Sequence, residues 1–188
     1  STDSSPVFQA ATAVFFDSGG TNKTHVAVFE GSSATPTSYT VVDTYTPFEG
    51  WAVSGDGNVV VGLGWLGCAD AHAVRWSEAD GIQDLGSTVP DNSSRANGAD
   101  FDGNVIIGWQ DGAGRQGAVW VDGVQELIFL PGGGAASEAF DVSSDGQWVT
   151  GIGFGSPVAA ASAYRYNTET DTTEEIPNLA GGGEARFA

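Results

Sequence analysis

The sequence predicts an all-β protein built from copies of one antiparallel unit, and three observations support this prediction. A ten-residue segment with a central Asp-Gly pair occurs three times, with its aspartates at Asp56, Asp102 and Asp145, 46 and then 43 residues apart. Glycine is abundant, with 28 copies among 188 residues. β-Branched and aromatic residues recur in short runs, as in strands separated by turns. A repeat of this length indicates units that bury their cores against one another.

The repeated segment predicts a hairpin. In its first copy a strand over residues 50–54 runs into the pair Asp56-Gly57. This pair is typical of a type I′ turn, in which both central residues have positive φ. The pair returns as Asp102-Gly103 and Asp145-Gly146. A side-chain oxygen two residues before each pair is expected to bond turn amides. It belongs to Ser54, Asp100 and Ser143. These residues are therefore interpreted as turn formers rather than catalytic groups.

Each unit then adds three more strands. The turn is followed by a continuously apolar run (59–61 in the first copy), which is typical of a strand buried on both faces. A glycine closes each run and indicates a bend or the close approach of a neighbouring backbone. These glycines are Gly62, Gly108 and Gly151. A third strand (71–76) precedes a fourth (82–85) that alternates apolar with polar residues, as an outer strand does. Four such strands are the pattern of a β-propeller blade.

The prediction is a single repeat domain over residues 1–188 with about four blades. Its units are approximately 11–46, which is degenerate, 47–92, 93–135 and 136–180. The first unit lacks a first strand, and residues 181–188 resemble the first strand of a further or ring-closing blade. Pairing of these end strands would remove two exposed edges. A four-bladed ring, a larger ring shared by two chains, and a fragment of a longer array all remain open.

Residues 48–188 resemble the bacterial HAF repeats, an extracellular family. Its pattern is a Val-Ser-x-Asp-Gly turn, a Val-Val-Gly strand, an Ala-Phe-x-Trp strand and an Asp-Leu-Gly ending. Residues 72–76 carry the signature as His-Ala-Val-Arg-Trp, and residues 82–86 carry the ending. The second unit departs at Gly117, and the third has Tyr164 and Tyr166 for the aromatics. The resemblance implies a secreted or surface-attached protein of propeller-like fold, and it brings no catalytic residues. The turns are also similar to the Ser-Pro-Asp-Gly turns of TolB-type propellers.

Composition narrows the range of partners. Six Lys and Arg against 24 Asp and Glu give a formal net charge of −18. This charge argues against nucleic acid or an anionic membrane, because both attract basic surfaces. No apolar run approaches the roughly 20 residues of a membrane-spanning helix. Cys68 is the only cysteine, which excludes an intrachain disulfide but leaves an interchain bridge open. The small number of basic residues fits an extracellular or cell-surface location.

The face opposite the Asp-Gly turns is where we expect function to lie. Its loops are longer and more varied, and binding residues tend to occupy variable loops on a rigid scaffold. An exposed Trp beside Asp or Arg would stack on a sugar ring and hydrogen-bond its hydroxyls. The candidate ligand-binding residues are Trp65, Trp109, Asp111, Arg115 and Phe154. The alternative is that Trp109 and Phe154 pack between blades.

An enzymatic function finds little support in the sequence. The two histidines, His25 and His72, occupy third-strand positions of the repeat and are interpreted as structural. No nucleophile elbow or phosphate-binding loop is present, and no carboxylate pair stands out for glycoside chemistry. Asp100 with Asp102 offers at most a weak calcium site without an EF-hand signature. We therefore predict no catalytic residues and no cofactor.

Three functions follow as hypotheses. The first is a non-catalytic binding module for a glycan or a protein partner, which requires Trp65 or Trp109 to be exposed on the loop face. The second is a structural subunit of an extracellular assembly, such as a surface layer, a filament or a shared ring, self-associating through the end strands. The third and least supported is a glycan-active hydrolase or lyase, which would need clustered polar residues on the inner strands.

Overall fold

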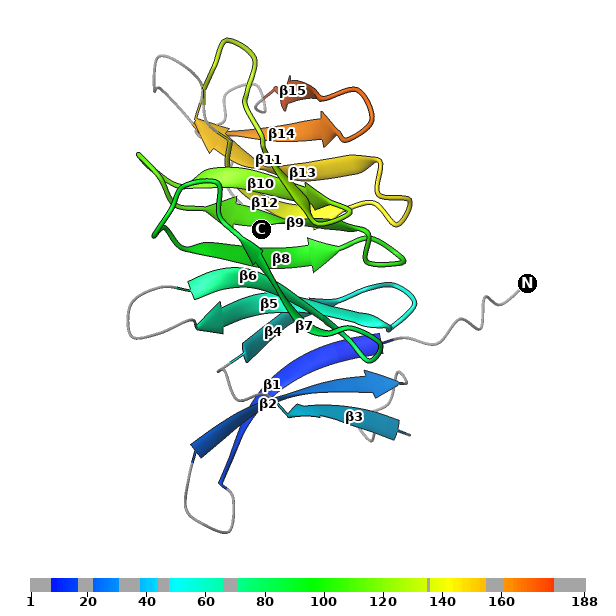
Figure 1. Ribbon diagram of the computed structural model, residues 1–188. Helices are drawn as coiled ribbons and strands as arrows, with labels where there is room; N and C mark the ends of the chain where they lie inside the picture. Colours follow the sequence, from blue (N-terminus) through cyan, green and yellow to red (C-terminus); the bar gives the residue numbers. More distant parts are fainter. Residues whose placement is uncertain are drawn as a thin grey trace, which may run out of the picture.

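The computed structural model describes residues 8–16, 22–30, 38–43, 48–65, 71–134, 136–154 and 161–177, with side chains from Phe48 onward except that of Phe154. These residues form four antiparallel sheets, each with its strands in chain order (Figure 1). The described ranges hold no helix that is long and apolar enough to cross a membrane. The predicted all-β class with blade-like four-stranded sheets is confirmed.

The strands follow the predicted order closely. The first sheet holds β1 (Phe8–Phe16), β2 (Asn22–Glu30) and β3 (Ser38–Asp43). The second holds β4 (Phe48–Val53), β5 (Val59–Trp65), β6 (Ala71–Ser77) and β7 (Gly81–Gly86). The third holds β8 (Ser94–Ala99), β9 (Val105–Gln110), β10 (Gln116–Val121) and β11 (Val124–Leu127). The fourth holds β12 (Ala136–Val142), β13 (Trp148–Phe154), β14 (Ala161–Asn167) and β15 (Thr172–Ile176).

Among the described residues, the three-stranded sheet has no innermost strand of a blade. In the later blades the second and third strands contact the first strand of the following blade: β5 and β6 contact β8, and β9 and β10 contact β12. β1 and β2 contact β4 in the same way, so they occupy second-strand and third-strand positions. The expected completion of this sheet by residues 181–188 lies outside the described residues.

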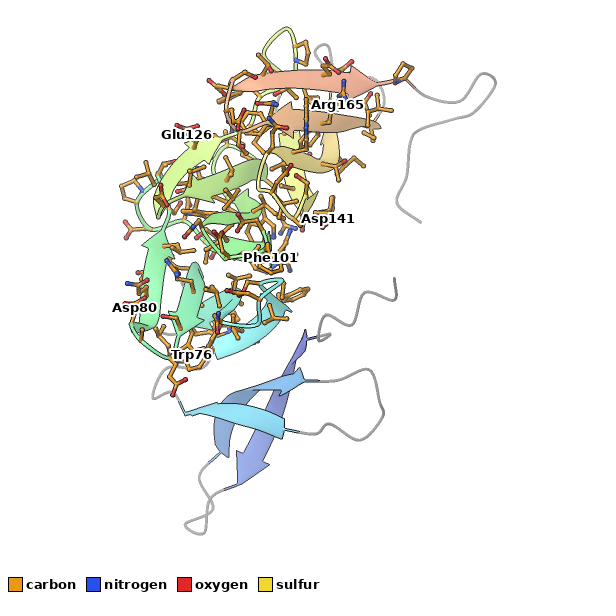
Figure 2. All side chains as sticks on the ribbon, turned by 90° about the vertical axis from the view of Figure 1, so that its right-hand side faces the viewer. Trp76, Asp80, Phe101, Glu126, Asp141 and Arg165 are labelled. Atoms are coloured by element: carbon orange, nitrogen blue, oxygen red, sulfur yellow. The ribbon has the colours of Figure 1, made fainter. Side chains whose placement is uncertain are left out.

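The sheets are stacked, with their inner strands on one side. Figure 1 shows them following one another from β1–β3 at the bottom to β12–β15 at the top. In Figure 2 the outer side of the stack is marked by Asp80 and Glu126, and Asp141 of the innermost strand β12 lies on the other side. β4 contacts β8, and β8 contacts β12, so the innermost strands form one continuous surface. We call this surface the inner face.

The core lies between the sheets rather than on one side of them. Ile106 packs in a buried cluster with Trp120 and with Val61 of the second sheet. The next residue, Ile107, belongs to a second cluster with Val149 and with Tyr164 of the fourth sheet. Successive residues of β9 thus point into two different interfaces, because side chains alternate along a strand. This explains the continuous apolar runs, and their predicted burial on both faces is confirmed for the first two copies. In the third copy Val149 is buried but Trp148 and Thr150 are exposed, so the prediction was wrong there.

The Asp-Gly turns differ from the predicted type I′ geometry. The glycines have positive φ (79° at Gly57, 75° at Gly103 and 73° at Gly146), but the aspartates before them do not. Gly57 N donates to Ser54 O at 2.9 Å, so the turn spans residues 54–57 with the glycine last. A true two-residue loop with positive φ at both positions occurs at Asp122-Gly123, where Val121 pairs with Val124. The type I′ prediction was therefore wrong for the repeated turn, because Asp56 accepts hydrogen bonds from both sides of it.

The repeated turns also join neighbouring blades. Asp56 N donates to Phe101 O at 2.8 Å, and Phe101 N donates to Ser144 O at 3.1 Å. The first and second turns therefore each hydrogen-bond to the turn of the following blade. Within each turn, the predicted side-chain oxygen accepts a hydrogen bond from the first amide of the next strand. The three bonds are Val59 N to Ser54 Oγ (2.9 Å), Val105 N to Asp100 Oδ1 (3.0 Å) and Trp148 N to Ser143 Oγ (2.9 Å).

The glycine that closes each repeated segment faces the backbone of the innermost strand. A Cβ atom on Gly62 would lie 1.8 Å from the carbonyl oxygen of Glu49. The corresponding distances are 1.9 Å from Gly108 to Arg95 O and 2.1 Å from Gly151 to Glu138 O. The predicted close approach of a backbone is confirmed. It accompanies a β-bulge in each innermost strand, where the pairing register shifts.

Candidate functional site

The bulges place one residue from each blade on the inner face outside the regular pairing. The residues at these register shifts are Trp51 in β4, Asn97 in β8 and Phe140 in β12. These positions are equivalent in the repeat, as are the charged residues two positions earlier. The charged residues are Glu49, Arg95 and Glu138. The backbone is thus the same in the three blades, whereas the side chains that it presents differ in size and charge.

Arg95 is the centre of a polar network across the third and fourth sheets. Its Nη2 donates to Glu138 Oε1 at 2.8 Å, and its Nε donates to Asn97 Oδ1 at 2.8 Å. Asn97 Nδ2 in turn donates to Glu138 Oε1 at 3.1 Å and to Ala139 O at 2.7 Å. Burial lowers the pKa of the Arg95 guanidinium, and the charge of Glu138 acts in the opposite direction. The group stays ionised, because arginine cannot lose its proton in a protein.

Aromatic rings and guanidinium groups stack beside this network. The Arg95 guanidinium lies 4.0 Å from the centre of the Trp51 ring and 5.2 Å from that of Trp109. The Arg115 guanidinium lies 3.9 Å from the centre of the Trp109 ring. Such contacts are attractive, because the negative face of an indole ring meets a cation. We call Trp51, Arg95, Asn97, Trp109, Arg115 and Glu138 the inner-face cluster.

The cluster has buried and exposed members. Trp109 is only 6% exposed and Glu138 only 13%, so both belong to the interior of the cluster. Trp51 is 50% exposed and the side chain of Arg115 45% exposed. Among the described residues, the contacts of Arg115 to acids are long, 3.5 Å from Nη1 to Glu138 Oε2 and 3.7 Å from Nε to Asp111 Oδ1. Trp51 and Arg115 are therefore the members that a ligand can reach.

Trp65 extends the site along the second sheet. It is 38% exposed at the end of β5, and its Nε1 donates to Glu49 Oε1 at 3.4 Å. Glu49 interacts electrostatically with Arg95 of the cluster. Exposed tryptophans thus lie at both ends of a chain of interacting side chains, Trp65 at one and Trp51 at the other.

The sequence-predicted ligand residues differ in how exposed they are in the structure. Trp65 is exposed as expected, Arg115 belongs to the cluster, and Asp111 lies beside Arg115. Trp109 is wrong as an exposed ligand platform, because its ring is only 6% exposed and lies against two guanidinium groups of its own blade. The side chain of Phe154 lies outside the described residues, and so does Cys68.

Sequence reasoning missed Trp51, Arg95 and Glu138 as site residues. They lie on the innermost strands rather than on the longer loops, where function was expected. A signal was nevertheless present in the aligned repeats, because the turn residues repeat while the positions equivalent to Trp51 carry different residues and Arg95 replaces the Glu of the other two copies. Divergence at equivalent positions of one backbone would have pointed to them.

Two other residues considered in the sequence, His72 and Asp100, make contacts that stabilise the fold. His72 Nδ1 lies 2.9 Å from Asp84 Oδ1 on the neighbouring strand of the same sheet. Asp100 is buried and bonds the turn amide of Val105. Among the described residues there is no group of three or more His, Cys, Asp or Glu side chains that could hold a metal ion.

The stacked four-stranded sheets with their innermost strands on one face define a protein of the β-propeller class. No protein-family model matches the chain, and no curated protein matches it. Its fold is similar to that of TolB from Acinetobacter baumannii, with 14% identity, a TM-score of 0.56, and coverage of 92% of this chain and 41% of that chain. The putative TolB from Agrobacterium tumefaciens gives 17% identity and a TM-score of 0.57 over 93% of this chain and 63% of that one.

A puromycin-hydrolyzing peptidase from Mycobacterium tuberculosis is similar at 18% identity and a TM-score of 0.55, over 82% of this chain and 25% of the peptidase. The chain therefore spans less than two thirds of each of these proteins. At such identities the similarity establishes the TolB-like β-propeller fold and nothing about activity.

Proposed function

We propose that this protein is a non-catalytic β-propeller module, secreted or displayed at the cell surface, that binds a glycan through the inner-face cluster and Trp65. The observation that supports this proposal best is the half-exposed Trp51 ring, which lies 4.0 Å from the Arg95 guanidinium of a partly buried ion pair. A fixed, accessible aromatic face beside polar groups is the arrangement of many binding sites.

The chemistry of the site suits a sugar. The C–H face of a sugar ring stacks on an indole, while its hydroxyl groups both donate and accept hydrogen bonds. Arg115 offers guanidinium donors, and Asp111 offers carboxylate acceptors 3.7 Å away. At the neighbouring position Trp65 offers a second indole ring and Glu49 offers another carboxylate. A ligand on this surface would therefore find stacking surfaces and hydrogen-bonding groups of both kinds.

A binding role rather than catalysis is supported by the pairing of the polar groups. Arg95, Asn97 and Glu138 hydrogen-bond to one another and are largely buried. Side chains that are hydrogen-bonded to one another in this way fix the conformation of the site, and they are poorly placed to transfer protons to a substrate. The location outside the cell is proposed from the resemblance to HAF repeats and from the acidic composition.

The proposal is tested by titrating the full chain with a panel of oligosaccharides in a calorimeter. For a ligand that binds, Trp51→Ala is expected to weaken affinity at least tenfold, or about 1.4 kcal/mol, because it removes the stacking platform. Trp148→Ala is the matched control: Trp148 is 36% exposed and has Arg165 4.8 Å from its ring, but it lies beside the Asp145-Gly146 turn. It is expected to change affinity less than about twofold, which is under half a kcal/mol.

The proposal is wrong if no glycan of the panel binds, or if the two variants lose affinity equally. Thermal unfolding of both variants provides the check on folding. The non-catalytic part is tested separately by prolonged incubation with the bound glycan. We expect no new reducing ends and no shortened products, and their appearance at a rate that Trp51→Ala abolishes would assign an enzyme instead.

A further inference from the structure

We infer that the inner-face cluster is built for an uncharged glycan longer than one sugar residue, with Trp51 as the platform and Arg115 and Asp111 as the hydroxyl-binding groups. The inference rests on the proposed function and specifies the ligand of the same site.

The first step is to separate the groups that hold the site from those that remain for a ligand. Arg95, Asn97 and Glu138 are bonded to one another at 2.8–3.1 Å through Nε and Nη2 of Arg95, the amide of Asn97 and Oε1 of Glu138. The contacts of Arg115, at 3.5 and 3.7 Å, are longer than ordinary hydrogen bonds. Arg115 therefore retains N–H donors that a ligand can engage without breaking the scaffold.

The second step is the charge of the site. The two cations, Arg95 and Arg115, face the carboxylates of Glu138, Asp111 and Glu49. Each cation is thus already compensated by an acid. An anionic ligand would have to compete with Glu138 and Asp111 for Arg115, and it would approach a chain whose formal charge is −18. Its own charge would be desolvated without a free counter-charge.

A cationic ligand is disfavoured for a different reason. The best cation-binding surface of the site is the Trp51 ring, and the Arg95 guanidinium already lies against it at 4.0 Å. A second cation would meet Arg115 as well. An uncharged polyhydroxyl ligand avoids both conflicts, because its hydroxyls donate to Asp111 and accept from Arg115 while its ring stacks on the exposed part of Trp51.

The third step concerns the length of the ligand. Trp65 is bonded through its Nε1 to Glu49, which is two residues before Trp51 on the same strand. Two residues of a strand span about 7 Å, so the two indoles serve neighbouring parts of one ligand. We therefore expect oligosaccharides to bind more tightly than the corresponding monosaccharides, and Trp65→Ala to remove most of that difference.

The test compares neutral hexo-oligosaccharides with uronic-acid oligosaccharides of matched length, titrated into the full chain. We expect the neutral series to bind at least tenfold more tightly. We also expect its affinity to change less than about twofold between about 0.02 and 0.5 M NaCl, because no charge pair forms with the ligand. Arg115→Gln should weaken neutral binding by less than tenfold, since the amide still donates. Arg165→Gln, which alters an exposed arginine of the last sheet paired with Glu174, should leave it unchanged.

The possible failures are distinguishable. Tighter binding of the uronic-acid series, or a steep loss of affinity with salt, overturns the inference of an uncharged ligand but leaves the glycan-binding function intact. Equal affinity for monosaccharide and oligosaccharide overturns the inferred length. Binding of neither series overturns the proposed function itself. Neutral binding that Trp51→Ala does not weaken places the site elsewhere and overturns both.

Discussion

The Ser-x-Asp-Gly turns and the inner-face cluster both lie on the repeated blade. The turn residues are nearly the same in every copy, whereas the residues at the cluster positions differ. At the turns, the blades use almost the same residues to make the same hydrogen bonds, from Ser54 in one copy to Ser143 in another. At the cluster, equivalent positions carry Trp51, Asn97 and Phe140 on one repeated bulge. The difference teaches that repetition marks the parts that stack blades, and that the residues diverge on the part that we propose binds a ligand.

The glycines that close the repeated segment link the two regions, since they belong to the repeated segment but contact the strands that carry the cluster. Gly108→Ala tests this link with the largest expected effect. Its Cβ would meet Arg95 O at 1.9 Å and Ala96 Cα at 3.0 Å, so the innermost strand must move. We expect a loss of about 3 kcal/mol or more in the free energy of unfolding, measured by urea denaturation.

Gly114→Ala is the matched control for that substitution. Gly114 lies on the loop between β9 and β10, has no heavy atom within 4 Å of its added Cβ, and is not among the residues with positive φ. Its effect should stay within about 0.5 kcal/mol, as for most surface substitutions. Equal losses for the two variants would show that close backbone approach is not the reason for the repeated glycine.

A smaller effect is expected at the turn itself. Ser143 Oγ donates to Asp145 Oδ1 at 2.5 Å and accepts from Trp148 N at 2.9 Å. The hydrogen bond from Ser143 lowers the pKa of Asp145. Ser143→Ala should cost about 1 kcal/mol of stability and move the pKa of Asp145 back toward its ordinary value, which NMR titration would show. Ser144→Ala, one residue further along the same turn, is expected to do neither. An unchanged pKa in the Ser143 variant would contradict the assigned hydrogen bond.

The second copy of the turn breaks the pattern, because Asp100 stands where the other copies have serine. Burial raises the pKa of Asp100, and the neighbouring carboxylate of Asp102 adds to the shift. The folded protein then holds a proton at pH values where the unfolded chain has released it. Stability therefore falls as pH rises from the ordinary carboxyl range through the raised pKa, and the full penalty is present above it.

Asp100→Ser should remove this penalty, since a hydroxyl can donate to Asp102 and still accept from Val105 N. We expect a gain of about 1 kcal/mol at pH 7, the scale of one hydrogen bond. The gain should shrink as pH falls toward the ordinary carboxyl pKa. Denaturation series at several pH values measure it. Ser54→Asp provides the converse, and it should introduce the same pH dependence into the first copy. A gain for Asp100→Ser that does not vary with pH would contradict the raised pKa of Asp100 as its cause.

Much of the fold could be predicted from the repeat, and much of the candidate site could not. The spacing of the repeated segment predicted the blade-like sheets, and the glycine that closes each segment correctly indicated a close backbone approach. The type I′ geometry was wrong, because the side chain of Asp56 organises the turn through bonds that the pair Asp-Gly does not reveal. Trp109 was wrong as an exposed platform, since an exposed and a buried tryptophan look alike in a sequence.

The sequence by itself determined the repeated unit, the order of its strands and which residues form its turns, because these depend on short-range alternation of side chains and on local backbone preferences. Only the tertiary structure decided which side chains meet on the inner face. Arg95 and Glu138 lie 43 residues apart, and their ion pair exists because β8 and β12 are neighbours in the stack. Contacts of that kind are set by how the blades pack, so no pattern within a single blade can predict them.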